Sequence, residues 1–244
     1  MKVDVNADMG ESFGRYNLGN DEALMKYITS ANVATSFHAG DPLVMEKTVV
    51  LAKKYNVAVG AHVGLPDRQG FGRRMMDITK DELRSDTLYQ LGALDGILKV
   101  YEMTMQHIKP HGILYRMVSE NKNYIDTFLN TVKEYDPNLF IMLPPNTPAF
   151  ERGIQLGLKM AGEADEGNWI IERNKAARSA EEVAGRALSV AKEKKIATIS
   201  GKMIAINAVT VCIHGDAPDA EKEAKCVRET LEANGVTPAN LNEL

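Results

Sequence analysis

The chain has few cysteines, no long apolar stretch and no strong excess of either charge. Its two cysteines, Cys212 and Cys226, are too few for a disulfide framework and favour a reducing compartment. No apolar run approaches the roughly 20 residues that span a bilayer, and the first residues lack the apolar core of a signal peptide. The net charge of −4 argues against a broad nucleic-acid or anionic-membrane surface. We therefore expect a cytoplasmic protein that binds neither nucleic acid nor membrane.

Two phosphate-binding signatures are also missing. No G-x-G-x-x-G follows the first expected strand, and no G-x-x-x-x-G-K-[ST] occurs anywhere in the chain. These absences disfavour nucleotide binding by a Rossmann or P-loop fold, and they leave open ATP bound in another way. No H-E-x-x-H or H-x-H motif gives local metal-ligand spacing, so the sequence leaves a divalent metal open and its ligands unknown.

Short β-like runs alternate with longer helical patterns along the chain. The expected strands are Lys2–Asp8, Ala31–Phe37, Val57–His62, Met105–Lys109, Leu139–Leu143, Leu158–Glu163, Ala197–Ser200 and Thr210–His214. Such alternation predicts an α/β fold with a parallel sheet covered by helices. Seven or eight units in 244 residues favour closure into an irregular (β/α)7–8 barrel, as a single domain over residues 1–244, and an open Rossmann-like sheet is the alternative.

The helices between these strands have clear start signals. Capping boxes begin at Thr79 and Ser179, and a capping residue followed by proline occurs at Asp41 and Thr147. The last helix is expected to open over Asp216–Pro218. Gly235 is well placed to end that helix, because glycine adopts the left-handed conformation of a helix C-terminus.

Four of the five histidines lie at or just beyond the end of an expected strand. His38, His62, His111 and His214 are each followed within two residues by glycine. In a parallel barrel the carboxyl ends of the strands meet on one face, and that face carries the active site. A single histidine at such a position is more often a hydrogen-bonded structural residue. Four in matching positions predict one shared polar site.

The first and fourth strands add charged side chains to this face. The first strand ends at Asn6-Ala7-Asp8, and Glu11 follows shortly after it. Asp8 is a candidate base or metal ligand. Lys109 precedes His111 by two residues and so shares its face of the strand. It could take part in acid–base chemistry or hold an anionic group, and pairing with a carboxylate is the alternative.

Three further polar residues are candidates with a structural alternative. Asp41 and Asp216 both precede expected helices, so each could cap a helix instead of facing a ligand. Arg73 belongs to the polar, glycine-containing segment Pro66–Arg74 between the third strand and the long helix. A loop of this kind on the functional face is a candidate lid or anion clamp, and a solvated loop is the alternative.

Longer blocks of sequence resemble one known family. The matching blocks are Asp4-Val5-Asn6-Ala7-Asp8-Met9-Gly10-Glu11-Ser12-Phe13-Gly14, Ser30-Ala31-Asn32-Val33, Phe37-His38-Ala39-Gly40-Asp41-Pro42, Gly60-Ala61-His62-Val63-Gly64, Gln69-Gly70-Phe71-Gly72-Arg73-Arg74, Leu88-Tyr89-Gln90-Leu91-Gly92-Ala93-Leu94, Lys109-Pro110-His111-Gly112-Ile113-Leu114-Tyr115 and Cys212-Ile213-His214-Gly215-Asp216. They span almost the whole chain in the family's order. On these blocks the chain resembles the LamB/YcsF family.

The resemblance implies a glycoside hydrolase/deacetylase-like barrel and the activity of a subunit of an ATP-dependent 5-oxoprolinase. Such an enzyme hydrolyses the lactam of 5-oxo-L-proline to L-glutamate with hydrolysis of ATP, in a complex with two other subunits. The catalytic candidates are then Asp8, His38, His62, Lys109, His111 and His214, and the substrate-binding candidates are Asn6, Glu11, Asp41, Arg73 and Asp216. We expect Asp8 or His62 to act as base for water, and Lys109 and His111 to face the oxyanion or phosphate.

The chain departs from the family pattern in two places. Thr35 and Ser36 stand where the family has cysteine and glycine, and the segment after Glu163 is shorter and lacks an arginine and a tyrosine. Two alternatives therefore stay open. One is a metal-dependent deacetylase-like hydrolase that needs no ATP, and the other is a lactam-binding regulatory paralogue without turnover.

Overall fold

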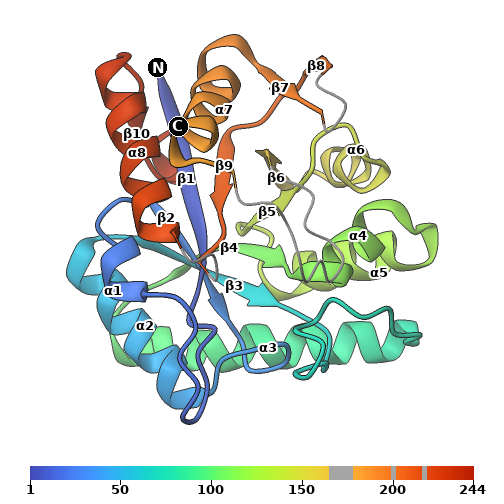
Figure 1. Ribbon diagram of the computed structural model, residues 1–244. Coiled ribbons are helices and arrows are strands. Elements are labelled where there is room, and N and C mark those ends of the chain that lie inside the picture. The colour runs from blue at the N-terminus through green and yellow to red at the C-terminus, as the bar shows by residue number, and fades with distance from the viewer. Residues whose placement is uncertain (165–177, 199–201, 216–218) are drawn as a thin grey trace.

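A closed barrel of seven parallel strands forms the centre of the computed structural model, within the residues that it describes (1–164, 178–198, 202–215 and 219–244; Figure 1). The barrel strands are, in order, β1 (Lys2–Met9), β2 (Ser30–Ala34), β3 (Ala58–Val63), β4 (Met105–Pro110), β5 (Phe140–Leu143), β6 (Lys159–Ala164) and β9 (Thr210–Ile213). The barrel closes where β9 pairs with β1, with Asp4 opposite Thr210 and Asn6 opposite Cys212. The predicted α/β barrel is confirmed.

Helices surround these strands (Figure 1). They are α1 (Asp21–Leu24), α2 (Pro42–Tyr55), α3 (Lys80–Val100), α4 (Gly112–Glu120), α5 (Lys122–Tyr135), α6 (Pro148–Gln155), α7 (Ala180–Glu193) and α8 (Ala220–Ala233), with a short 3-10 turn at Leu241–Glu243. Their apolar faces pack on the outside of the barrel, and the buried residues Leu83, Leu91 and Leu94 of α3 form one such face. Among the described residues, no helix combines the length and the apolar character that crossing a membrane requires.

The predicted helix starts are confirmed at four positions. The side chains of Asp41, Thr79, Thr147 and Ser179 each accept a hydrogen bond from a backbone N–H in the first turn. The last helix differs from the prediction, because α8 begins after Asp219, and Asp216–Pro218 lies outside the described residues.

One predicted barrel strand, Ala197–Ser200, is wrong. The described part of this segment ends β7 (Lys195–Ala197), which pairs antiparallel with β8 (Met203–Ala205) in a separate two-stranded sheet. Ile199 and Ser200 lie outside the described residues. The connection is too short for the crossover that two parallel strands require. The second strand also ends earlier than predicted, at Ala34 instead of Phe37.

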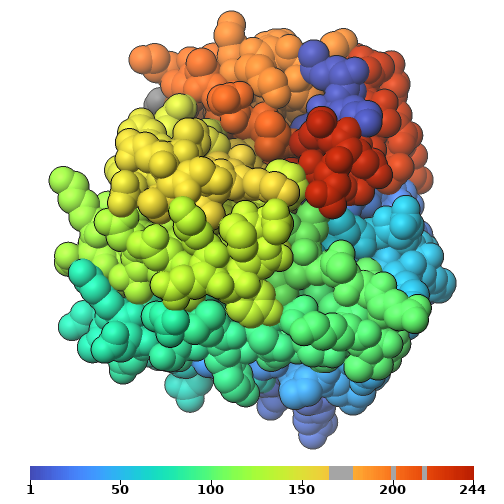
Figure 2. Space-filling model, turned by 180° about the vertical axis from the view of Figure 1, so that it is seen from behind, coloured from blue at the N-terminus to red at the C-terminus, as the bar shows by residue number. Residues whose placement is uncertain are grey.

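The C-terminal residues pack beside the N-terminus. The short strand β10 (Thr237–Pro238) pairs parallel with β1, with Thr237 opposite Lys2. From behind, the C-terminal residues lie directly against the first residues of the chain (Figure 2). This pairing extends the sheet beyond the closed barrel on one side of β1.

The interior of the barrel is unusually polar. Along β1 the buried polar residues Asp4, Asn6 and Asp8 alternate with apolar residues, so they share one face of the strand. His107 of β4 fills the space beside Gly60 of β3, where an added Cβ atom would overlap the imidazole ring. Glycine at position 60 therefore makes room for a polar layer beneath the carboxyl ends of the strands.

We predict that Gly60→Ala destabilises the protein strongly because its methyl group overlaps the His107 ring. Overpacking of this kind costs about 3 kcal/mol or more. The matched control is Gly92→Ala, on an exposed position of α3 where a Cβ meets nothing within 4 Å. It should stabilise the helix by about 0.5–1 kcal/mol. Urea unfolding of both variants checks this, and equal stabilities would contradict the described packing.

Candidate active site

The structure brings the six catalytic candidates together at the carboxyl ends of the strands. Asp8, His62 and Lys109 are the last or next-to-last residues of their strands, and His111 follows β4 directly. His38 and His214 lie just beyond β2 and β9. The side chain of His214 is 16% exposed, whereas that of Asp8 is only 6% exposed. His214 is thus positioned nearest to the solvent.

Lys109 lies between two carboxylates. Its Nζ is 3.0 Å from Asp8 Oδ1 and 3.0 Å from Glu163 Oε1. The Sγ of Cys212 is 2.9 Å from the same nitrogen. All four side chains are buried, so the attraction between the ammonium and the carboxylates is only weakly screened by water. This cluster places one positive charge and two negative charges inside the mouth of the barrel.

Asp8 contacts most of the other candidates. Its Oδ1 accepts a hydrogen bond from Asn32 at 2.8 Å and lies 3.4 Å from His62 Nε2, while its Oδ2 lies 3.6 Å from His214 Nδ1. Burial by itself raises the pKa of Asp8, but His62 and Lys109 outweigh it and hold that pKa well below its ordinary value. Asp8 is therefore ionised at neutral pH.

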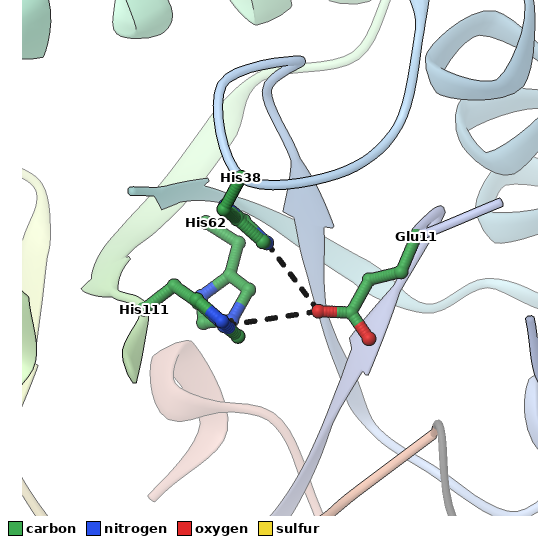
Figure 3. A group of neighbouring side chains, drawn as sticks. All are labelled: Glu11, His38, His62 and His111. Carbon is green, nitrogen blue, oxygen red and sulfur yellow. Dashed lines mark hydrogen bonds and ion pairs between the residues drawn. The ribbon is translucent and has the colours of Figure 1, made fainter. Parts of the chain in front are cut away.

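Three histidines and one glutamate form a second group (Figure 3). The rings of His38 and His111 stack at 3.8 Å, and the ring of His62 stands edge-on to both. Glu11 Oε1 lies 3.3 Å from His38 Nε2 and 3.7 Å from His111 Nδ1. Burial, together with neighbouring histidines, lowers the pKa of His38 and His111 well below the ordinary value. Both are neutral imidazoles at neutral pH.

Two sets of side chains have the composition of a divalent-metal site. Glu11, His38, His62 and His111 form the first set, and Asp8, Cys212 and His214 form the second. Within each set the candidate ligand atoms lie within 4.8 Å of one another. Imidazole, carboxylate and thiolate are all ligands of divalent transition metals.

A hydrogen-bonded polar layer supports these groups from below. Asn6 Nδ2 donates to Glu163 Oε1 at 2.9 Å and to Thr210 Oγ1 at 2.7 Å, and Asn6 Oδ1 accepts from Asn32. Thr210 Oγ1 in turn donates to Asp4 Oδ2 at 2.5 Å. Asn6 is fully buried and bonded on both sides of its amide. It positions Glu163 and Asn32, and its predicted contact with substrate stays a prediction.

The other substrate-binding candidates differ in their surroundings. Asp41 caps α2 and also accepts a hydrogen bond from Gly14 N at 2.7 Å, as in the capping alternative. Asp216 lies outside the described residues. Arg73 is half-buried, with its guanidinium 5.2 Å from the centre of the Phe71 ring. Its charge contributes to the lowered pKa of both His38 and His111, so it lies on the same side of the site.

The loop that carries Arg73 is braced from within. Asp67 accepts hydrogen bonds from Gly70 N and from the guanidinium of Arg74. The carbonyl of Phe71 accepts a hydrogen bond from His111 Nε2 at 2.7 Å. The loop thus covers the histidine group and fixes one of its rings.

Sequence reasoning missed three residues of this site. Glu163 ends a strand in the same way as Asp8 does, so the rule that selected Asp8 could have found it. Tyr115 lies on α4 and donates a hydrogen bond from its hydroxyl to Glu163 at 2.8 Å. Asn32 lies within β2, with no charge to mark it, and links Asn6 to Asp8.

The chain is similar to proteins connected with lactam metabolism. A model described as the LamB/YcsF family matches residues 3–244. The chain is 44% identical to a 5-oxoprolinase subunit of Thermococcus sibiricus, in an alignment that covers 100% of this chain and 99% of the relative. The crystal structure of the lactam utilization protein from Thermus thermophilus has a TM-score of 0.87 and 38% identity, and covers 98% of this chain and 99% of that one.

A more distant structure shares only the fold. The family 4 carbohydrate esterase from Streptomyces lividans, in complex with acetate, has a TM-score of 0.54 and 11% identity. The two chains match over 98% of this chain and 92% of the other. The predicted deacetylase-like character of the barrel is therefore confirmed.

The buried Asp4 generates a pH-dependence prediction. Burial raises the pKa of Asp4 from 3.8 to about 6, although Ser30, Thr210 and Thr29 donate hydrogen bonds to it. Because the folded state binds this proton more tightly, the associated stability is complete below pH 4 and is lost as the pH rises through about 6. The loss at pH 8 amounts to at most roughly 3 kcal/mol.

Asp4→Asn removes this titration. The unfolding free energy of the wild type, minus that of Asp4→Asn, should fall between pH 5 and pH 8, as measured by urea unfolding. The variant is the matched reference, because all other carboxylates are common to both proteins. A difference that stays constant over this range would show that Asp4 does not titrate there.

Proposed function

The chain belongs to the LamB/YcsF family, and on this premise we propose that it is the hydrolytic subunit of an ATP-dependent 5-oxoprolinase. The observation that carries the proposal is the 44% identity to a protein named as a 5-oxoprolinase subunit, over essentially the full length of both chains. The clustered acids, bases and cation at the barrel mouth supply the groups that the reaction needs.

Opening a lactam requires three kinds of assistance. The oxygen of water bonds to the carbonyl carbon, the carbon–nitrogen bond breaks, and the ring nitrogen takes a proton to become the amine of glutamate. The water needs a base, the carbonyl oxygen needs a positive charge or hydrogen-bond donor, and the leaving nitrogen needs an acid. Transfer of a phosphoryl group from ATP to the carbonyl oxygen would make the ring carbon more reactive.

We assign the proton transfers to His214, oriented by Asp8. Asp8 Oδ1 is occupied by Asn32 and Lys109, whereas Oδ2 lies on the side of His214 at 3.6 Å. His214 is also the most accessible of the described catalytic candidates. This assignment differs from the sequence-based expectation that Asp8 or His62 is the base, because both are more deeply buried than His214.

Lys109 is the group suited to the carbonyl oxygen. Its ammonium is fixed by Asp8 and Glu163 on two sides, so it needs little reorganisation when negative charge develops nearby. Arg73, on the loop above the histidine group, is suited to a carboxylate or phosphate of the substrate. The role of the two other subunits is proposed to be the handling of ATP, and a cytoplasmic location stays a prediction.

The test is reconstitution with the two partner subunits. We expect release of glutamate from 5-oxoproline that requires ATP, and a fall of about 100- to 10,000-fold in Asp8→Asn, because this change removes the charge that orients His214. The matched control is Asp126→Asn on the exposed face of α5, where only an ion pair with Arg152 is lost. It should keep the wild-type rate.

The other outcomes separate the alternatives. Glutamate release without ATP would favour the deacetylase-like hydrolase. Binding of 5-oxoproline by calorimetry without any release, in the presence of both partners, would favour the regulatory paralogue. Thr35, one of the departures that motivated the latter, is buried and bonds to the carbonyl of His62 and to Gln90. It braces the site as a structural residue.

A further inference from the structure

We propose that Glu11, His38, His62 and His111 bind one divalent transition-metal ion, with His62 Nε2 and His111 Nδ1 as the central ligands. The inference goes beyond the proposed reaction, because it concerns what these side chains bind and holds whichever substrate is hydrolysed. It depends on the direction in which each imidazole ring donates its hydrogen bonds.

The backbone fixes the tautomers of two rings. His62 Nδ1 lies 3.0 Å from the carbonyl oxygen of Lys109, and His111 Nε2 lies 2.7 Å from the carbonyl oxygen of Phe71. A carbonyl oxygen can only accept a hydrogen bond, so each of these nitrogens must carry the proton. In the neutral rings, His62 Nε2 and His111 Nδ1 therefore present lone pairs.

These two lone pairs face each other at 2.9 Å. Without a positive charge between them, two acceptors at this distance repel. The nearest other atoms make the problem worse, because Asp8 Oδ1 lies 3.4 Å from His62 Nε2 and Glu11 Oε1 lies 3.7 Å from His111 Nδ1. The arrangement requires either an extra proton or a metal ion.

A metal ion satisfies more of these atoms than a proton does. One proton on His62 would point at His111 and Asp8, and would leave Glu11 and His38 outside the interaction. A cation would be shared by the two imidazoles and the Glu11 carboxylate, with His38 Nε2 3.3 Å from the same carboxylate oxygen (Figure 3). The four candidate ligand atoms all lie within 4.8 Å of one another.

The surroundings have the form that metal-binding histidines usually have. A ligating imidazole generally donates its other ring N–H to a carbonyl or carboxylate, which fixes the ring and makes the ligating nitrogen more basic. His62 and His111 both do so, toward carbonyls of two different segments. Two ligands at right angles on an ion with bonds of about 2.1 Å lie about 3.0 Å apart, close to the observed 2.9 Å.

The donor set narrows the type of ion. Three neutral imidazoles and one carboxylate suit zinc, manganese, iron or cobalt in the divalent state, and they are poorly suited to calcium or magnesium, which prefer oxygen ligands. When bound, such an ion can polarise a carbonyl oxygen or lower the pKa of a bound water.

The test is direct measurement of metal binding. The purified full-length chain is stripped with a chelator and titrated with Co²⁺ and Zn²⁺ by calorimetry, with the visible absorption of bound Co²⁺ as the spectroscopic signature. We expect one ion per chain, and an affinity at least about 100-fold weaker in His111→Gln and in Glu11→Gln. Circular dichroism and thermal melts of the stripped variants show whether they are folded.

Two controls keep the proposal falsifiable. His214→Gln and Cys212→Ser belong to the other group of candidate ligands and should keep the affinity of the wild type. Binding that these controls weaken while His111→Gln does not would move the site to the second group and overturn the proposal. So would absence of stoichiometric binding, with ¹⁵N NMR showing a proton held between His62 Nε2 and His111 Nδ1 in the presence of either metal.

Discussion

Pairing of β1 with β9 is the constraint on which the candidate site depends. It places Asn6 opposite Cys212 and so joins the first strand to one that begins more than 200 residues later. Without it Asp8 would lie far from His214. Because all seven barrel strands within the described residues run in the same direction, their carboxyl ends meet at one mouth. The functional groups are brought together by register and closure, since no short sequence motif holds them.

The polar interior has an energetic cost that the arrangement offsets. Burying an unpaired charge is very unfavourable, and a buried ion pair is tolerated only when its geometry and hydrogen bonds are good. Lys109 meets this condition, with two carboxylates at 3.0 Å and further support to Glu163 from Asn6 and Tyr115. Such a network holds its members in fixed positions, which is what a site for charge development requires.

The sequence predicted the barrel and the meeting of the strand ends, because both follow from strand–helix alternation and from the direction of parallel strands. It could not predict Asn32 or Tyr115, whose importance depends on which neighbours the register brings near them. Asp41 shows a further limit: a carboxylate before a helix has the same pattern whether it caps or binds ligand, and only the contact with Val44 N reveals capping. Ala197–Ser200 failed because β propensity does not specify the partner strand.

Neutron diffraction from a crystal of the deuterated protein tests the central claim most directly, because it locates both the side chains and their protons. The account predicts a charged Lys109 ammonium between Asp8 and Glu163, with deuterium on His62 Nδ1 and His111 Nε2 and all these groups at one barrel mouth. Histidine rings dispersed into solvent or into separate apolar surroundings, or a Lys109 side chain directed away from both carboxylates, would contradict it.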